Sequence, residues 1–186
     1  MTSARAGAML AAGLAALLAL ALGSEAGAQN RSLEYPVKAT YLYKFAPFVD
    51  WPPTAFASPT SPVNLCVAGD DPFGAMLEQA VAGQQISGRP VAVRRLQTVG
   101  PRSGCHILYV AGSRGQSAAE ALKSVDGTSV LTVTDAARTP NTRGVIHFVV
   151  QNDRVRFHID EQAAARNRLS ISSKLLSLAL SVRHRG

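Results

Sequence analysis

Residues 145–160 place the strongest constraint on the fold, because their pattern predicts a β-hairpin in a single register. Two runs of alternating apolar and polar residues flank Asn152 and Asp153, which tolerate the positive φ of a two-residue turn. Folding the chain about that turn pairs Phe148 with Phe157 and His147 with His158. One face then carries six apolar side chains: Ile146, Phe148, Val150, Val155, Phe157 and Ile159. A slip of one residue would invert both faces, so we expect this register and a partner that covers the apolar face.

The rest of the chain alternates between short apolar strands and short helices. We expect strands at residues 63–68, 90–96, 105–111 and 129–134. This alternation predicts an α/β fold: a layered sheet of mostly parallel strands flanked by helices, with the C-terminal antiparallel β-hairpin at one edge.

The expected helices follow capping residues and apolar stripes. The first runs over residues 36–49, starts at Pro36 and is interrupted at Pro47; its aromatic stripe is expected to pack in the core. Asp71 is the expected N-cap of a helix that ends near Val81, and residues 117–123 form the next. A helix capped by Asp160 and a final helix over residues 172–183 are expected to cover the hairpin.

The N-terminus has the layout of a secretory signal peptide over residues 1–28. Arg5 precedes an apolar run over residues 9–22, and small residues end at Ala28, the expected cleavage point. The run is shorter than the roughly 20 residues that span a bilayer, which argues against a membrane anchor. We therefore expect an exported single domain over residues 29–186.

The formal net charge of +7 suggests acidic partners for this exported chain, such as lipid headgroups or an acidic protein surface, although a soluble surface that carries excess arginine is the simpler interpretation. Nucleic acid is not an expected partner, because export separates the protein from it and the basic residues are scattered without interleaved aromatic residues. We expect no cofactor.

The chain has two cysteines, Cys66 and Cys105. In an exported protein they favour a disulfide over a metal site, and two buried free thiols are the alternative. Parallel neighbouring strands would need a register offset to bring the two residues within bonding distance.

Two constellations could carry chemistry. His147 and His158 face each other across the hairpin, where they could bind a metal or respond to low pH, although two solvated histidines are the simpler interpretation. Ser113, Asp135 and His158 follow the chain order of an α/β-hydrolase triad, which makes a small esterase the enzyme alternative.

An ordered series of motifs resembles the YfiR family along nearly the whole expected mature chain. The matching segments are residues 34–39, 41–45, 48–52, 66–74, 88–90, 105–110, 145–160 and 171–176. The resemblance implies a small periplasmic α/β protein that forms homodimers and represses an inner-membrane diguanylate cyclase through its periplasmic region. It also implies relief of that repression by an outer-membrane lipoprotein.

By position, the resemblance implies a disulfide between Cys66 and Cys105. A second disulfide of the best-known member has no counterpart, since residues 134–150 contain no cysteine. The partner surface of the family maps onto the hairpin and the helices after it, with Phe148, Val149, Glu161 and Leu169 as candidate contacts.

These observations together predict a non-enzymatic periplasmic signalling regulator that lowers cyclic di-GMP output and thereby affects biofilm formation. The alternative is a periplasmic small-molecule sensor domain that serves a histidine kinase.

Overall fold

The computed structural model describes residues 25–185 and divides the chain into two units, residues 1–34 and residues 35–186. Of the first unit, only the beginning of helix α2 (Glu25–Lys44) is described. The apolar run of the expected signal peptide lies outside the described residues, and Ala28 falls within α2. Within the described part of the chain, no helix combines the length and the apolar character needed to cross a bilayer.

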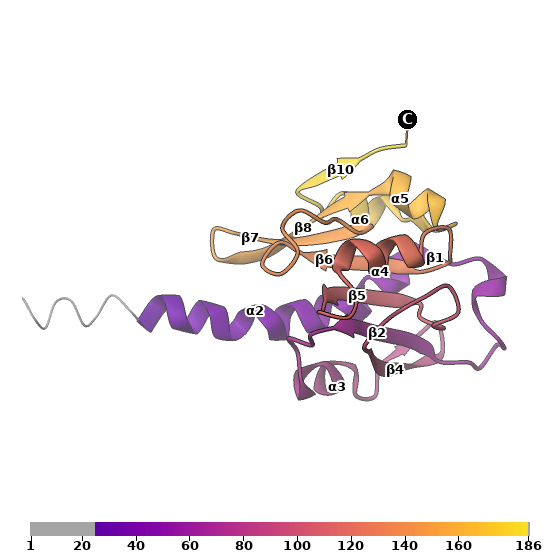
Figure 1. Cartoon of the computed structure of the whole chain (residues 1–186), viewed down its shortest axis with the longest axis horizontal. Coiled ribbons are helices and arrows are strands. Elements are labelled where there is room, and N and C mark those ends of the chain that lie inside the picture. Colours follow the sequence, from indigo (N-terminus) through magenta and orange to yellow (C-terminus); the bar gives the residue numbers. More distant parts are fainter. Residues whose placement is uncertain (1–24, 186) are drawn as a thin grey trace, which may run out of the picture. The chain divides into compact units, whose positions relative to one another are not determined.

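An eight-stranded sheet forms the centre of the second unit (Figure 1). Its strands are β2 (Val63–Gly69), β3 (Gln85–Ile86), β4 (Arg89–Leu96), β5 (Ile107–Gly112), β6 (Leu131–Asp135), β7 (Ile146–Gln151), β8 (Arg154–Asp160) and β10 (Ser181–Arg183). They lie in the order β10-β8-β7-β6-β5-β2-β4-β3. All neighbours are parallel except β7–β8 and β3–β4. This confirms the predicted α/β class.

The hairpin β7–β8 has the predicted register, with Phe148 opposite Phe157 and His147 opposite His158. Asn152 and Asp153 adopt φ values of 50° and 55°, as the two-residue turn requires. The hairpin does not form the edge of the sheet, however. Strand β10 pairs in parallel with the outer side of β8 and takes that place.

Side chains of the central strands alternate between two cores on opposite faces of the sheet. Leu65 and Val67 point into the larger core, which includes Leu42 of α2. Cys66 and Ala68 point to the other face, into a core covered by helix α4 (Ala118–Ser124). Because successive side chains of a strand point to opposite faces, α2 and α4 lie on opposite sides of the sheet.

The remaining elements connect and cover these strands. Helix α3 (Ala75–Val81) follows β2, and helices α5 (Glu161–Arg166) and α6 (Ser173–Leu176) follow the hairpin. A second, two-stranded sheet pairs β1 (Val49–Asp50) with β9 (Ser170–Ile171). Two short 3-10 helices, Ala46–Phe48 and Pro53–Ala55, lie on either side of β1.

Helix α2 differs from the prediction at its start and agrees at its end. It begins at Glu25, so Pro36 lies inside the helix and not at its first position. Pro47 interrupts it as expected, because proline has no backbone N–H and its ring clashes with the preceding turn. The α-helix ends at Lys44, and the 3-10 turn that contains Pro47 follows.

One of the two predicted N-caps, Asp160, is confirmed. The side chains of Ser117 and Asp160 accept the backbone N–H groups of Glu120 and Ala163. The prediction for Asp71 is wrong, because the N-cap of α3 is Gly74.

Asp71 instead accepts the N–H groups of Phe73 and Gly74, one turn before the helix, and forms an ion pair with Arg95. Its carboxylate holds the chain between β2 and α3, and this explains why the helix begins later than predicted.

The predicted final helix is also wrong beyond its first turn. Helix α6 ends at Leu176, and β10 follows on β8. Basic side chains near the end of the chain pair across the fold: Arg183 contacts Asp160, and His184 contacts Glu161. Pairing to a distant strand has replaced local helix formation in this segment.

The disulfide between Cys66 and Cys105 is present, with the two Cα atoms 5.8 Å apart. Cys66 lies opposite Leu108 in the sheet, and Cys105 precedes the first residue of β5. The chain therefore has to bend before β5 to bring Cys105 to Cys66. This bend provides the register offset that parallel pairing of the two strands alone would not give.

Candidate partner-binding surface

The inner face of the hairpin packs against α2 through aromatic rings. The ring of Phe45 lies 5.1 Å from that of Phe157 and 5.7 Å from that of Phe148, measured between centroids. Tyr41 contacts the same two hairpin rings at 5.9 and 6.1 Å. The predicted packing of the aromatic stripe in the core is confirmed, and these contacts fix the position of the hairpin against α2.

A buried ion pair lies beside these rings and joins α2 to the end of β6. The Nζ atom of Lys38 donates to Asp135 Oδ2 at 2.6 Å, and both side chains are almost completely buried. The hydroxyl of Tyr109 donates to the same carboxylate oxygen at 3.1 Å, and the N–H of Ala137 donates to Oδ1 at 3.0 Å. Burial, followed by the charge of Asp135, raises the pKa of Tyr109, so this residue stays a neutral donor.

The other face of the hairpin carries a row of polar side chains that crosses four strands. Thr134 Oγ1 lies 2.8 Å from His147 Nδ1, and His158 Nδ1 lies 2.6 Å from Ser181 Oγ. His147 and His158 face each other in the middle of the row. His147 is only 2 % exposed, so the expectation of two solvated histidines is wrong.

The connection between β6 and β7 lies beside this row. Gly144 in this connection donates its N–H to Thr134 Oγ1 at 2.9 Å, which places the connection against the row. No group of three or more His, Cys, Asp or Glu side chains able to hold a metal occurs in the described residues.

His147 is predicted to make the stability of the protein depend on pH. Burial, then the charges of Arg143 and His158, lower the pKa of His147 from 6.5 to about 4, and burial and Arg143 also lower the pKa of His158. Because the folded-state pKa of His147 is below that of the unfolded chain, stability is complete above about pH 6.5 and falls as the pH drops toward 4. From this residue we expect an unfolding free energy about 2 kcal/mol lower at pH 5 than at pH 7.5.

Urea unfolding at the two pH values measures this difference. The matched variant His147→Gln removes this titrating group and should lose its share of the pH dependence, whereas His106 and His158, whose pKa values are also lowered by burial, keep theirs. A wild-type difference that persists unchanged in this variant would contradict the assignment to His147.

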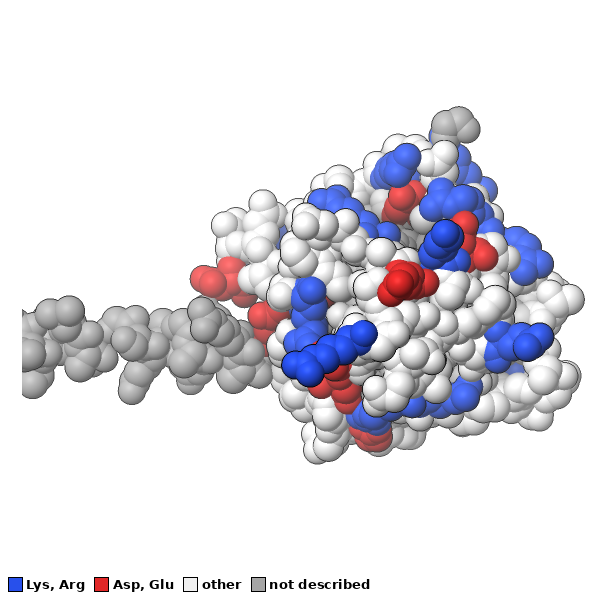
Figure 2. All heavy atoms as spheres, viewed as in Figure 1, with Lys and Arg blue, Asp and Glu red and all other residues white. Residues whose placement is uncertain are grey.

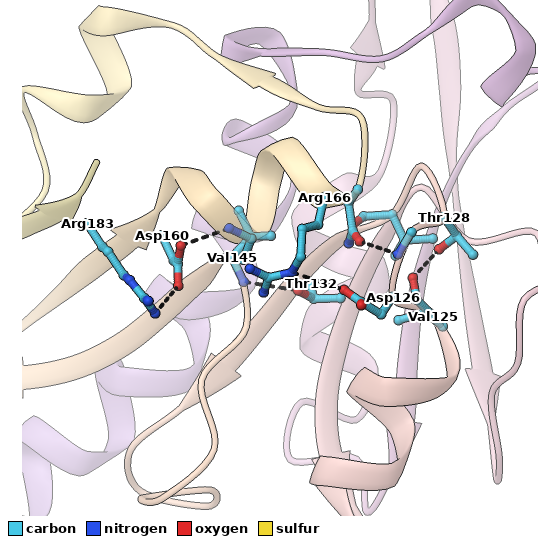
Figure 3. A network of polar contacts seen from close by, with 12 residues as sticks. Val125, Asp126, Thr128, Thr132, Val145, Asp160, Arg166 and Arg183 are labelled. Carbon is cyan, nitrogen blue, oxygen red and sulfur yellow. Dashed lines mark hydrogen bonds and ion pairs between the residues drawn. The ribbon is translucent and has the colours of Figure 1, made fainter. Parts of the chain in front are cut away.

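A network of polar contacts holds helix α5 between the hairpin and the loop before β6 (Figure 3). Asp160 accepts the N–H of Ala163 at 2.8 Å and lies 3.3 Å from the guanidinium of Arg183 in β10. At the other end of α5, Arg166 lies 3.4 Å from Asp126. Asn167, just after the helix, bonds the backbone of Gly127 and Val130. The N-terminal end of α5 is thereby tied to β8 and β10, and its C-terminal end to the loop.

Basic and acidic side chains are interspersed over this side of the molecule, with blue and red atoms adjacent over α5 and β10 (Figure 2). The ion pairs of Arg183 with Asp160 and of Arg166 with Asp126 belong to this region. Much of its positive charge is therefore balanced locally.

The four candidate contact residues differ in their accessibility. Phe148 and Leu169 are 0 % and 2 % exposed and lie in the core, so they present almost no surface to a partner. Val149 and Glu161 are half-buried and remain accessible, and Glu161 also contacts His184. The burial of Phe148 agrees with its place in the hairpin alternation.

The residues of the alternative esterase triad have separate partners. Asp135 is bonded to Lys38 and Tyr109, and His158 to Ser181. Ser113 bonds the backbone of Gln116 within its own loop. None of the hydrogen bonds among residues 25–185 joins two members of this alternative triad.

Sequence reasoning did not identify Lys38 and Tyr109 as buried partners of Asp135. The only signal was a lysine within an apolar helical stripe, next to Ala39. Its partner lies 97 positions further along the chain, and no local pattern connects the two.

A family model described as YfiR/HmsC-like matches residues 35–180, which is nearly all of the second unit. The chain belongs to the YfiR/HmsC-like family. This confirms the family resemblance. The family suggests a periplasmic regulator of diguanylate cyclase signalling, with a regulatory and not a catalytic role. No curated protein is similar enough to the chain to be reported as a relative.

Proposed function

We propose that the protein is a periplasmic repressor that binds the periplasmic region of an inner-membrane diguanylate cyclase and lowers cyclic di-GMP output. It acts by reversible binding, as a homodimer and without catalysis of its own. An outer-membrane lipoprotein relieves the repression by competing for the chain.

The observation that carries this proposal is the family match over residues 35–180, because it covers both cores, the hairpin and α5 together. Further support comes from the surface beside the hairpin, where Val150 is 50 % and Leu178 is 59 % exposed. Exposed apolar residues that gather on one surface mark sites of protein interaction. The separation of Ser113, Asp135 and His158 favours a binding role over an esterase.

Deletion of the gene should raise cyclic di-GMP several-fold, because a cyclase would lose its inhibitor. Expression of the full chain, with its own N-terminal segment, should restore the original level. Cyclic di-GMP is measured by mass spectrometry of cell extracts. An unchanged level in the deletion strain would contradict repression.

A pull-down from detergent-solubilised membranes identifies the partner. We expect a transmembrane diguanylate cyclase among the proteins retained by the tagged chain. Recovery of a histidine kinase alone would instead indicate a sensor domain that serves that kinase.

A further inference from the structure

Two neighbouring cavities lie along the exposed side of α2. The first, of about 360 Å³, lies between α2, β8 and the chain around α6. Its lining residues are Tyr41, Lys44, Phe45, Phe48, Val155, Arg156, Phe157, Leu175 and Leu178. The second, also of about 360 Å³, is lined by Pro36, Val37, Thr40, Tyr41 and Lys44. Since Tyr41 and Lys44 line both, the cavities form one elongated groove, called here the α2 groove.

Apolar side chains extend beyond the ends of the α2 groove. Leu178 is 59 % exposed at one side of the first cavity, and Val37 is 40 % exposed in the second. Val150 lines neither cavity but lies opposite Val155 in the hairpin and is 50 % exposed. The apolar surface is thus longer than a compact small molecule would cover.

The charged residues that line the α2 groove are Lys44 and Arg156, and both are positive. Neither forms an ion pair with another of the described residues. Two copies of the chain meeting through this surface about a two-fold axis would bring these cations close to those of the other copy, which disfavours self-association here. Charge complementarity calls for an occupant with carboxylates.

We propose that the α2 groove receives an amphipathic helix of the partner, with its apolar side against Tyr41, Val155 and Leu178 and its acidic side chains toward Lys44 and, at the open edge of β8, Arg156. A helix is about 10 Å wide and presents apolar side chains at positions i, i+3, i+4 and i+7, so it matches a long groove with an apolar floor. This inference rests on the proposed function, because it requires a protein partner.

Charge reversal tests the proposal against a matched control on the opposite face of the sheet. In the pull-down from solubilised membranes, the double variant Lys44→Glu/Arg156→Glu should retain at least about tenfold less cyclase than the wild type. The control Arg114→Glu/Lys123→Glu changes the net charge equally, at exposed residues in and just before α4, and should stay within about twofold of the wild type. Equal thermal unfolding of all three proteins shows that folding is unaffected.

Photocrosslinking identifies the occupant directly. A photoreactive benzoylphenylalanine in place of Leu178 should crosslink to a peptide of the cyclase that has acidic residues and apolar residues at helical spacing. The same group in place of Ala119, exposed on α4, should not.

The possible results separate this inference from the proposed function. If the groove variant and the wild type retain equal amounts of cyclase, the proposed docking site is wrong. The proposed repression is not affected by that result. A Leu178 crosslink to a second copy of the chain, or a lipid in the groove with no protein crosslink, would also overturn the proposed docking site. A wild-type chain that retains no membrane protein would overturn both proposals.

Discussion

The variant Asp135→Ala is expected to lose about 3–5 kcal/mol of unfolding free energy, the largest effect that we predict for a single substitution. The Asp135 carboxylate lies 2.6 Å from the Lys38 ammonium and also accepts bonds from Tyr109 and Ala137, all in the interior. Its removal leaves a buried positive charge without this counter-ion and a buried hydroxyl without this acceptor. Urea unfolding at pH 7.5 measures the loss.

An exposed ion pair provides the control. Asp126 lies 3.4 Å from Arg166, and both side chains are more than half exposed. Asp126→Ala should therefore change the free energy of unfolding by less than about 1 kcal/mol. A loss below about 1 kcal/mol for Asp135→Ala as well would contradict the structural role of the buried pair.

The double variant Lys38→Met/Asp135→Leu tests the cause of the loss. It removes both charges and fills the site with apolar atoms, so it should recover much of the stability lost by Asp135→Ala. Equal instability of the single and the double variant would show that packing, and not the isolated charge, dominates.

Reduction of the disulfide is expected to cost about 4 kcal/mol, the second large effect. Cys66 and Cys105 are 39 positions apart, so the bond removes much conformational freedom from the unfolded chain. Comparison of urea unfolding with and without a reductant measures the difference on an otherwise unchanged protein.

The double variant Cys66→Ala/Cys105→Ala separates this effect from other actions of the reductant. Its unfolding curve should be the same in both conditions and should lie close to that of the reduced wild type. If the reductant leaves the wild-type curve unchanged while the thiols are shown to be free, the bond does not contribute the expected stability.

The hairpin could be predicted to the residue because all of its determinants are local. The turn residues Asn152 and Asp153 and the alternation on either side lie within residues 145–160, and any slip would expose Phe148 and Phe157. The disulfide was inferred from compartment and family resemblance. The geometry of the disulfide depends on a bend before β5, which no sequence pattern predicts.

The end of the chain could not be predicted from local patterns. Leu175, Leu176, Ala179 and Val182 have helical spacing, but the helix stops at Leu176. The backbone after it pairs with β8, and Arg183 reaches Asp160, 23 positions earlier. These long-range contacts outweigh the intrinsic preference of a short segment.

The same limit applies to the candidate site. The opposition of His147 and His158 follows from the register, but no local pattern in the sequence predicts that His147 is buried. The α2 groove combines α2, β8 and the chain around α6 and has no motif of its own. The family resemblance places the partner surface on the hairpin and the helices after it. The structure shows that the accessible apolar side chains lie beside the hairpin.

The short strands at the two ends of the sheet also limit how copies of the protein can associate. β10 contributes three residues at one edge, and β3 contributes two at the other. Where β8 extends beyond β10, its open backbone is flanked by Arg154 and Arg156. Short edges and charged edge residues hinder the addition of a strand from another molecule, the first step of sheet-driven aggregation. The sheet is thus protected from fibril growth through its edges, and the association of copies is left to side-chain surfaces.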